Sequence, residues 1–431
     1  MVSIYQEAHC LVQLNKGPWK RRLIQWSEHK VDFIDSDSYS LEYRILPDSC
    51  LKVLKCEGFK VEIEACPKID GNRIHTVFDI LLDNIQCQES LIEFMNDNGF
   101  RPSTRKKILV LINPVSGKGK ALKIWNNVHA MVNRAAEFEV IQTEKAGHAQ
   151  ELAHNLDINH YGGIVTVSGD GGLWEIVNGL YTRKDWNEVA SKFPIGMVPG
   201  GSGHAMHCSL LYHQKESFDQ EYIVSALNIG RGNSMVYDYI ECTTEDKSYI
   251  SLFGVAWGVI PEVDVGSEFM RFLGPNRGRL LGIWRWFIPR FHPGTVYYQT
   301  LEDQSEMPDI NNPVPKTWKC VEGPFLNVYA SKQPWLDYEM LFCPEAKAED
   351  GILWLVVIKG TINRWDSMYW LLNGQTSGHL RSKHTFMIPI KAFRFIPSDG
   401  KEAPMTIDAE LLQGGKVQGK VKQNGVNIMV K

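Results

Sequence analysis

The sequence lacks several features that would place it in a class immediately. No run reaches about 18 consecutive apolar residues, so no segment is expected to span a membrane as a helix. The nine cysteines include no C-x-x-C pair, which argues against a zinc site or a disulfide scaffold and favours a reducing compartment. The net charge of −4 gives no reason to expect a nucleic-acid partner. The N-terminal segment lacks a signal-peptide pattern, and Val2 stands where N-myristoylation requires glycine, so we expect a cytoplasmic protein.

A phosphate-binding loop of the P-loop type is also missing. The stretch VLINPVSGKGKALKIW, residues 110–125, places glycine and lysine after an apolar run. A P-loop requires G-x-x-x-x-G-K-[ST], but Ala121 follows Gly119-Lys120, and Pro114 stands where the first glycine belongs. The spacing therefore excludes a P-loop NTPase, and a different site must explain this loop.

The patterns that are present divide the chain into three regions. Residues 1–104 contain alternating runs such as CLKVLKCEGFKVEIEA and close on one helical pattern, so we expect a small β-rich extension. Residues 105–229 alternate apolar strands with helices, which predicts a parallel sheet that binds ligands at the carboxyl ends of its strands. Residues 230–431 contain many short strand-like runs, with helical stretches near 267–290 and at 364–375, which predicts an antiparallel sandwich or barrel.

The strongest local signal is TVSGDGGLWEIVNGL, residues 166–180. A buried strand is predicted to end at Ser168, and Gly169 and Gly171 flank Asp170 just before a helix. Backbone N–H groups in such a turn form a binding site for anions, so a carboxylate at the same place suggests that it has a chemical role. One such role is that of a general base, which accepts a hydroxyl proton beside the γ-phosphate of a nucleotide. Taken alone, the motif fits a tight turn with Asp170 as a helix cap equally well.

Two further glycine-rich turns strengthen the first interpretation. MVPGGSGHAMHCSL, residues 197–210, again runs from a strand through glycines into a helix. The three turns, at 113–120, 168–172 and 199–203, follow strands of the same predicted parallel sheet. Because the carboxyl ends of parallel strands share one edge, the three turns together would line a nucleotide-sized groove.

Several motifs, in this order, resemble the lipid kinase family that includes diacylglycerol, ceramide and sphingosine kinases. The motifs are NPVSGKGKA, TEKAGHAQELA, VSGDGGLWEIVNGL, PGGSG, AWGVIPEVDVGSE, RFLGPNRGRL, KAFRFIPSDGK and IDAE. Their order and sequences most resemble the sphingosine kinases, over residues 105–431. The resemblance implies an α/β nucleotide domain like that of phosphofructokinase and NAD kinase. An antiparallel β-sandwich that binds lipid would follow it, with the active site in the cleft between them.

The resemblance also implies a reaction, in which ATP and Mg²⁺ serve to phosphorylate the primary hydroxyl of sphingosine or a related sphingoid base. Asp170 would deprotonate that hydroxyl, and Asp264 would receive the cationic amine, which needs an anionic partner. Arg271 and Arg277 match the arginines that contact phosphate, and Asp408 matches a ligand of Mg²⁺. The other nucleotide-side positions implied by the resemblance are Asn113, Thr143, Ser168, Gly169, Gly171, Glu175, Gly200, Gly201, Ser202, Gly203 and Glu410.

Three positions depart from the family pattern and keep alternatives open. His204 stands where the family usually has Asn, Ala409 replaces the glycine of D-G-E, and Gly254 stands where sphingosine kinases often have Ser. One alternative is a ceramide or diacylglycerol kinase, although the uncharged amide of ceramide would leave Asp264 without a purpose. Ceramide kinases carry a pleckstrin-like module where this chain has its β-rich extension. The other alternative is a lipid-binding protein without turnover.

The lipid tail needs a long apolar slot. We expect Ile260, Val263, Trp370, Leu371 and Phe386 to line it, with the helix at 364–375 as a lid; the helix pattern alone fits an ordinary amphipathic helix equally well. 

A membrane-facing patch is expected as well, because the lipid must be collected from a bilayer. Lys118, Lys120, Leu280, Leu281 and Trp284 combine basic and apolar side chains, which suits reversible peripheral binding to anionic lipids. Assembly as a homodimer stays open at this stage.

Overall fold

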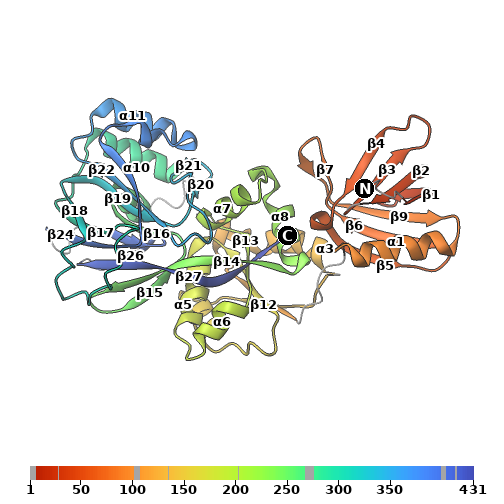
Figure 1. The fold of residues 1–431 in the computed structure, drawn as a ribbon, viewed down its shortest axis with the longest axis horizontal. Coiled ribbons are helices and arrows are strands. Elements are labelled where there is room, and N and C mark those ends of the chain that lie inside the picture. The colour runs from red at the N-terminus through yellow and green to blue at the C-terminus, as the bar shows by residue number, and fades with distance from the viewer. Residues whose placement is uncertain are drawn as a thin grey trace.

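The computed structural model describes residues 6–27, 29–100, 107–133, 135–201, 203–266, 276–398, 404–412 and 415–431. The N-terminal region lies at one end of an elongated molecule, the parallel strands lie in the middle, and the second β-rich region lies at the other end (Figure 1). None of the helices in the described part of the chain combines the length and apolarity that crossing a membrane requires.

The N-terminal region is β-rich, as expected, and closes with a helix. Seven antiparallel strands form its main sheet, in the order β4-β3-β2-β1-β9-β6-β5, and β7 (Lys68–Ile69) pairs separately with β8 (Asn72–Arg73). Helix α1 (Ile85–Asp97) begins where the Asn84 side chain accepts a hydrogen bond from the N–H of Cys87 at 2.9 Å. The alternating apolar residues form one core around Phe33 and Phe78, whose rings stack. The strands are β1 (Gln6–Leu14), β2 (Trp19–Ser27), β3 (Lys30–Asp35), β4 (Leu41–Ile45), β5 (Cys50–Lys55), β6 (Lys60–Ala65) and β9 (Thr76–Leu82).

The middle of the molecule contains the predicted parallel strands. They are β10 (Ile108–Ile112), β11 (Phe138–Gln142), β12 (Gly163–Ser168) and β13 (Ile195–Pro199). Helices cover both faces, and β10, β12 and β13 are accordingly buried along their whole length and mostly apolar. The helices are α3 (Ala121–Val132), α4 (His148–His154), α5 (Asp170–Tyr181), α6 (Trp186–Lys192), α7 (Ala205–His213) and α8 (Glu221–Arg231).

The order of these strands is β11-β10-β12-β13, so the connections reverse direction at β10. In open parallel sheets, ligands bind where the loops diverge at such a reversal. The loops that follow β10 and β12 carry two of the three predicted glycine-rich turns, and this topology therefore places them at the ligand-binding edge.

The parallel strands do not form a separate sheet. The last strand, β27 (Val417–Val430), lies parallel to β13, with Ile195 opposite Ile428, and also pairs with β14 (Asn233–Thr244) and β24 (Ala392–Pro397). The result is one sheet of ten strands that continues past the predicted boundary at residue 229. Its remaining strands are β15 (Ser248–Ser251), β17 (Gly294–Gln299) and β18 (Lys319–Glu322).

A six-stranded sheet of order β23-β22-β19-β16-β25-β26 packs against the far half of the ten-stranded sheet. Their shared core contains Trp257 and Phe325 from the smaller sheet and Phe393 and Phe395 from the larger one. The strands are β16 (Gly254–Gly258), β19 (Phe325–Ser331), β22 (Leu353–Lys359), β23 (Thr385–Ile390), β25 (Met405–Ile407) and β26 (Glu410–Leu412).

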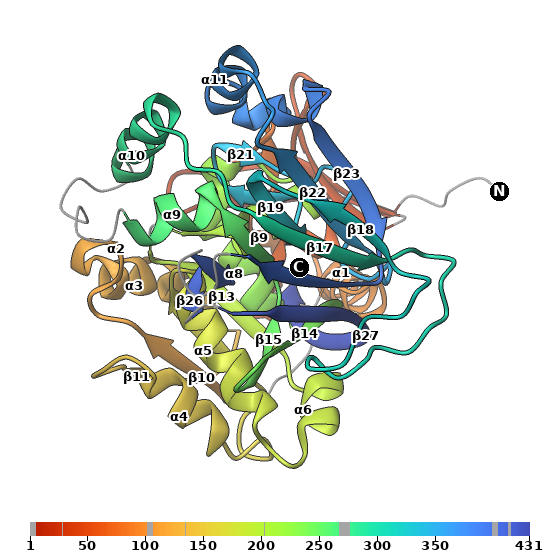
Figure 2. The same cartoon turned by 90° about the vertical axis from the view of Figure 1, so that its left-hand side faces the viewer.

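Three helices lie along one side of this smaller sheet (Figure 2). They are α9 (Val259–Gly266), α10 (Asn276–Phe287) and α11 (Arg364–Leu372). The helix expected at 364–375 is thus shorter, because the chain tightens into a 3₁₀ turn over Gly374–Thr376. A short hairpin of β20 (Trp335–Asp337) and β21 (Met340–Leu341) lies opposite α9.

Candidate active site

The glycine-rich turns come together at the carboxyl edge of the parallel strands. A Cβ atom on Gly117 would lie 2.4 Å from the carbonyl oxygen of Gly200, and one on Gly201 would lie 2.6 Å from the backbone nitrogen of Gly169. A Cβ on Gly203 would come within 3.3 Å of Oδ2 of Asp170. At Gly117 and Gly201 the backbones approach so closely that only glycine fits, and the three turns form one continuous cradle of backbone groups.

The first turn is held by its own backbone and side-chain contacts. Asn113 Oδ1 accepts a hydrogen bond from the N–H of Val115 at 3.2 Å, and the N–H of Asn113 bonds to the carbonyl of Val167 at 3.2 Å. The N–H of Thr143 donates to the carbonyl of Ile112 at 2.9 Å, which places Thr143 beside this turn. The exposed Lys118 has a φ of 59°, in the left-handed region.

Asp170 is the first residue of α5 and is almost fully buried. Its Oδ2 accepts a hydrogen bond from the N–H of Ala205 at 2.8 Å, and its Oδ1 accepts one from the N–H of Met206 at 3.4 Å, both at the start of α7. Burial raises the pKa of Asp170 to about 7, although these two hydrogen bonds lower it, and the charges of Asp408 and Asp337 raise it further. A carboxylate with a pKa near neutrality suits general-base chemistry.

Asp408 and Ala409 form the two-residue turn between β25 and β26, with φ of 51° and 66°. Positive φ at both positions is typical of a type I′ hairpin. Glu410 follows directly, and its Oε1 would lie 3.1 Å from a Cβ on Gly171. The hairpin therefore delivers Glu410 to the start of α5, next to Asp170.

Asp408 also has a structural task that the sequence did not reveal. Its Oδ1 accepts hydrogen bonds from Ser251 Oγ at 2.5 Å and from the N–H groups of Phe253 and Gly254 at 3.0 and 3.1 Å, and its Oδ2 accepts one from Leu252 at 2.8 Å. Burial raises its pKa to about 6 despite these bonds. In the described part of the chain, no group of three or more His, Cys, Asp or Glu side chains could hold a metal ion.

Two of the predicted nucleotide-side residues support the turns from behind. The two carboxylate oxygens of Glu175 accept hydrogen bonds from the N–H groups of Gly147 and Ala149, at 2.9 and 3.1 Å, and so hold the start of α4. The Oγ of the buried Ser168 lies 2.7 Å from Thr166 Oγ1. Ser202 and Arg271 lie outside the described residues, as does the side chain of Arg277.

His204 occupies the N-cap position of α7 and is buried, with its ring 5.3 Å from that of Tyr338. Burial lowers the pKa of His204 to about 4, so the ring is neutral near pH 7. The residue that replaces Asn of the family pattern is therefore an uncharged, packed side chain beside the cradle.

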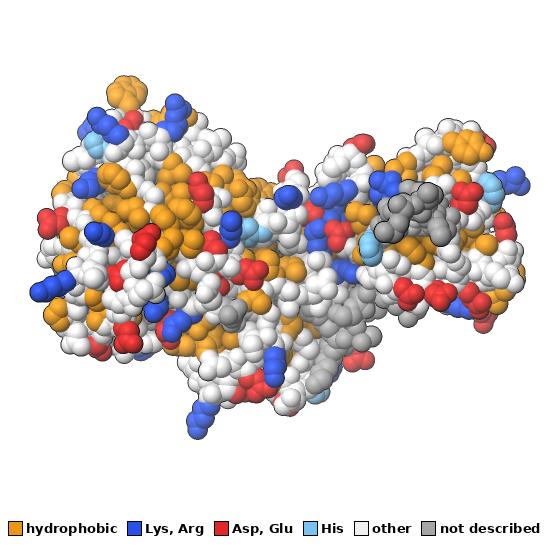
Figure 3. Space-filling view, viewed as in Figure 1, with side chains coloured by type: hydrophobic (Ala, Val, Ile, Leu, Met, Phe, Trp, Pro, Cys, Tyr) orange, Lys and Arg blue, Asp and Glu red, His pale blue; other side chains and the backbone are white. Residues whose placement is uncertain are grey.

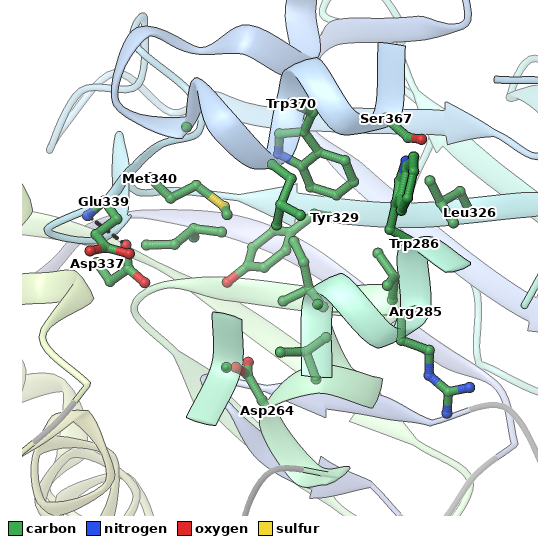
Figure 4. Close-up of a pocket in the computed structure, with 18 of the residues that line it drawn as sticks. Asp264, Arg285, Trp286, Leu326, Tyr329, Asp337, Glu339, Met340, Ser367 and Trp370 are labelled. Carbon is green, nitrogen blue, oxygen red and sulfur yellow. Dashed lines mark hydrogen bonds between the residues drawn. The ribbon is translucent and has the colours of Figure 1, made fainter. Parts of the chain in front are cut away.

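Asp170 lines a cavity of about 920 Å³ that extends into the second β-rich region. Figure 4 shows part of the lining of this cavity. Of the expected lipid-site residues, Ile260, Val263, Asp264, Trp370 and Leu371 line it. The exception is Phe386, which is absent from the cavity lining; its side chain on β23 is 43% exposed. Hydrophobic side chains also gather on the surface beneath α11 (Figure 3).

The cavity is also lined by residues that the sequence did not single out. Tyr329 on β19 and Met340 on β21 lie between Trp370 and the acidic end (Figure 4). Asp337 and Glu339, from the β20–β21 hairpin, lie together at that end. Their stretch, PWLDYEM, has no glycine turn or charge cluster that would have marked it.

Comparison with known proteins agrees with this geometry. Residues 107–241 match the diacylglycerol kinase catalytic domain. Sphingosine kinase 1 of Arabidopsis thaliana is 30% identical over 354 residues, which cover 74% of this chain and 71% of that protein. The chain belongs to the sphingosine kinase family. Human sphingosine kinase 1 is 29% identical, over 74% of this chain and 89% of that protein.

The fold agrees with this membership. A solved structure of a diacylglycerol kinase from Bacillus anthracis, only 14% identical, aligns with a TM-score of 0.51 over 76% of this chain and 98% of that one. 

The structure explains one departure from the pattern of sphingosine kinases. Gly254 has a φ of 155°, and a Cβ there would lie 2.3 Å from the carbonyl oxygen of Ala330. A serine would not fit at this position in this backbone.

Proposed function

We propose that the protein is an ATP-dependent lipid kinase that phosphorylates the primary hydroxyl of a sphingoid base to give its 1-phosphate. The observation that carries this proposal is the position of Asp170. Its buried carboxylate lies where the cradle of glycine-rich turns meets the lipid-sized cavity, and it lines that cavity itself. A base at this junction can accept the hydroxyl proton as the phosphoryl group is transferred.

The cradle fits the triphosphate of ATP, because it offers backbone groups with no side chains in the way and ends at the N-termini of α5 and α7. We assign Asn113, Thr143 and the loops at 168–171 and 200–203 to nucleotide binding, with Ser168 and Glu175 supporting them. Arg271 and Arg277 would supply positive charge to the phosphates.

Mg²⁺ fits the same edge. It is usually held by one or two carboxylates together with substrate phosphates and water, so a cluster of three acids is not needed. Asp408 is the ligand that the resemblance implies, but its carboxylate also fixes the hairpin; Glu410, which reaches the start of α5, is a further candidate. When bound, the ion would neutralise charge on the phosphates.

The carboxylates of the cavity match a cationic lipid headgroup. Asp264 on α9 lines the cavity (Figure 4), and we assign it to the ammonium group of the sphingoid base. Ile260, Val263, Trp370 and Leu371 would contact the tail, and α11 would act as the lid above it. We assign residues 105–229 to nucleotide binding. We assign residues 230–431, in which two sheets pack as a β-sandwich, to lipid binding. The β-rich residues 1–104 remain a separate unit in this proposal.

The surface that we expect to bind the membrane lies on α10. Leu280, Ile283, Trp284 and Phe287 are each 43–57% exposed and recur at helical spacing on one face. Leu281 points elsewhere, since its Cδ2 would lie 2.9 Å from a Cβ on Gly266 of α9. Together with the exposed Lys118 and Lys120, this face would bind anionic membranes reversibly.

The direct test offers labelled ATP and three lipids in mixed micelles: sphingosine, ceramide and diacylglycerol. We expect product from sphingosine. Product from ceramide or diacylglycerol instead would leave Asp170 in place but overturn the role of Asp264. Lipid binding without any product would overturn the kinase proposal in favour of a lipid-binding protein.

A further inference from the structure

The cavity holds more carboxylates than the proposed reaction uses. Asp170 would take the proton and Asp264 would receive the amine, but Asp337 and Glu339 line the same cavity without an assigned role. Asp337 and Glu339 lie side by side, and Asp264 lies apart from them (Figure 4). Asp337 is less exposed than Glu339 and ends strand β20.

Asp337 is held in place by its surroundings. Its Oδ1 accepts a hydrogen bond from the N–H of Glu339 at 2.8 Å, which closes the hairpin turn. Two residues earlier, the backbone N–H and carbonyl of Trp335 both lie 3.3 Å from Ser209 Oγ of α7, the helix whose N-terminus binds Asp170. Asp337 and the base are therefore positioned by the same helix.

The charge of Asp337 reaches Asp170, since it is one of the causes that raise the pKa of that carboxyl. Among the described residues, the two arginines that line the cavity lie away from Asp337. Arg285 lies on the far side from Asp337 (Figure 4), and the carbonyl of Arg364 accepts a hydrogen bond from Nε1 of Trp286 at 3.0 Å. In the part of the chain that the structure describes, Asp264 on α9 and Asp337 on the hairpin thus both bring negative charge to the cavity that Asp170 lines.

A free sphingoid base brings an ammonium group with three N–H donors to this cavity, whereas an N-acylated lipid brings a neutral amide with one donor. A site built for several charged donors rejects an analogue that leaves its buried acceptors unsatisfied.

We propose that Asp337 is a second specificity-determining carboxylate, which accepts a hydrogen bond from the ammonium of the lipid on the side opposite Asp264. This inference rests on the proposed function, because it concerns the headgroup of the same substrate. Asp337 and Asp264 together form an acidic clamp that favours free long-chain amines over their N-acyl forms.

The test compares two lipids, sphingosine and N-acetylsphingosine, with wild-type protein and Asp337→Asn, which keeps the shape and removes the charge. In Asp337→Asn we expect the ratio of kcat/KM for sphingosine to kcat/KM for N-acetylsphingosine to fall at least 10-fold, mainly because the KM for sphingosine rises. The KM for ATP should not change. Glu345→Gln, an exposed acid beyond the hairpin, is the matched control for loss of one charge.

A second readout separates a specificity role from a structural one. Loss of the negative charge at 337 should also move the acid limb of the pH profile of kcat towards lower pH, because Asp337 raises the pKa of Asp170. Asp337→Glu should restore part of the preference for the amine. If Asp337→Asn folds poorly, Asp337→Glu and Asp337→Ser are compared instead. The ratio of kcat/KM for the amine to kcat/KM for the amide should then be higher for Asp337→Glu than for Asp337→Ser.

Failure of this inference and of the proposed function give different results. Equal losses on both lipids, or an unchanged ratio, would overturn the role of Asp337 while wild-type turnover of sphingosine left the proposed function standing. No wild-type turnover of any long-chain amine would overturn both.

Discussion

At the scale of single residues, the burial of the Asp170 carboxyl lowers the stability of the fold at neutral pH. Its pKa rises from an ordinary 3.8 to about 7, so ionising it costs folding free energy. This cost is absent below pH 3.8, grows as pH rises, and is complete above about pH 7.

Asp170→Asn should therefore stabilise the fold at pH 8. We expect the free energy of unfolding to rise by about 2 kcal/mol, because removing the buried charge outweighs the loss of one acceptor for the N–H groups of α7. Urea unfolding at pH 8 and pH 5 measures this change, and the gain in free energy of unfolding should be smaller at pH 5. The control Asp219→Asn, at an exposed position, should show no gain at either pH. A loss of stability at pH 8 would show that the carboxylate is held ionised without cost.

The same pKa predicts the pH dependence of turnover. A base must be deprotonated to act, so kcat should rise tenfold per pH unit below about 7 and level off above it. Steady-state rates with saturating lipid between pH 5.5 and 8.5 test this expectation. A profile that is flat across this range would be incompatible with Asp170 as the base.

At the scale of elements, the β25–β26 hairpin shows how the chain tolerates a residue that its turn disfavours. Ala409 has a φ of 66°, where alanine is strained and glycine is not. Ala409→Gly should thus raise the free energy of unfolding by about 1 kcal/mol, as measured in urea. Ala146→Gly, in an exposed turn without a positive φ, should lower it slightly. Equal effects of the two changes would mean that the turn carries no strain.

The exposed face of α10 makes a second prediction for an element. Replacing Leu280 and Trp284 together with Gln should weaken binding to anionic vesicles at least tenfold, because both apolar side chains leave the bilayer interface. Turnover of lipid dispersed in detergent should stay near the wild-type rate. Leu46→Gln, which is 43% exposed in the N-terminal region, is the control. Equal loss of vesicle binding and of detergent turnover would place α10 in catalysis rather than at a membrane.

Elements also differ in how far the sequence predicted them. Helix α3 and the strands that end at the glycine-rich turns follow from local periodicity, since burial on both faces leaves unbroken apolar runs. The pairing of Ile195 with Ile428 could not be predicted, because a strand from the end of the chain that joins a distant sheet leaves no local pattern. The sequence did not predict Asp337 as a cavity residue for a similar reason, because only the fold brings its hairpin opposite α9.

At the scale of the whole molecule, an ion cluster joins the N-terminal region to the loop after α7 and to Lys431. Arg73 lies 2.8 Å from Glu216 and 3.2 Å from Asp48, and Lys431 lies 2.7 Å from Asp48. Arg231 of α8 adds hydrogen bonds to backbone carbonyls of the N-terminal region, such as that of Cys50 at 2.9 Å. The extension is therefore fixed to α8 rather than tethered loosely.

Arg73→Ala should destabilise the protein by about 3 kcal/mol, because it leaves the buried Glu216 with fewer cationic partners. Differential scanning calorimetry measures this loss. The control is Lys55→Ala, which removes the exposed ion pair with Glu89 and should change stability little. A separate early unfolding of the N-terminal region, with the remaining transition unchanged, would contradict the fixed attachment.

The most direct test of the account is transfer of labelled phosphate from ATP to sphingosine by the wild-type protein and by Asp170→Asn, with circular dichroism to confirm that the variant is folded. We predict phosphorylated product from the wild type and a fall in kcat of about 10²- to 10⁴-fold in the variant. Wild-type turnover that survives in a folded Asp170→Asn protein would contradict the assignment of the base on which the whole mechanism depends.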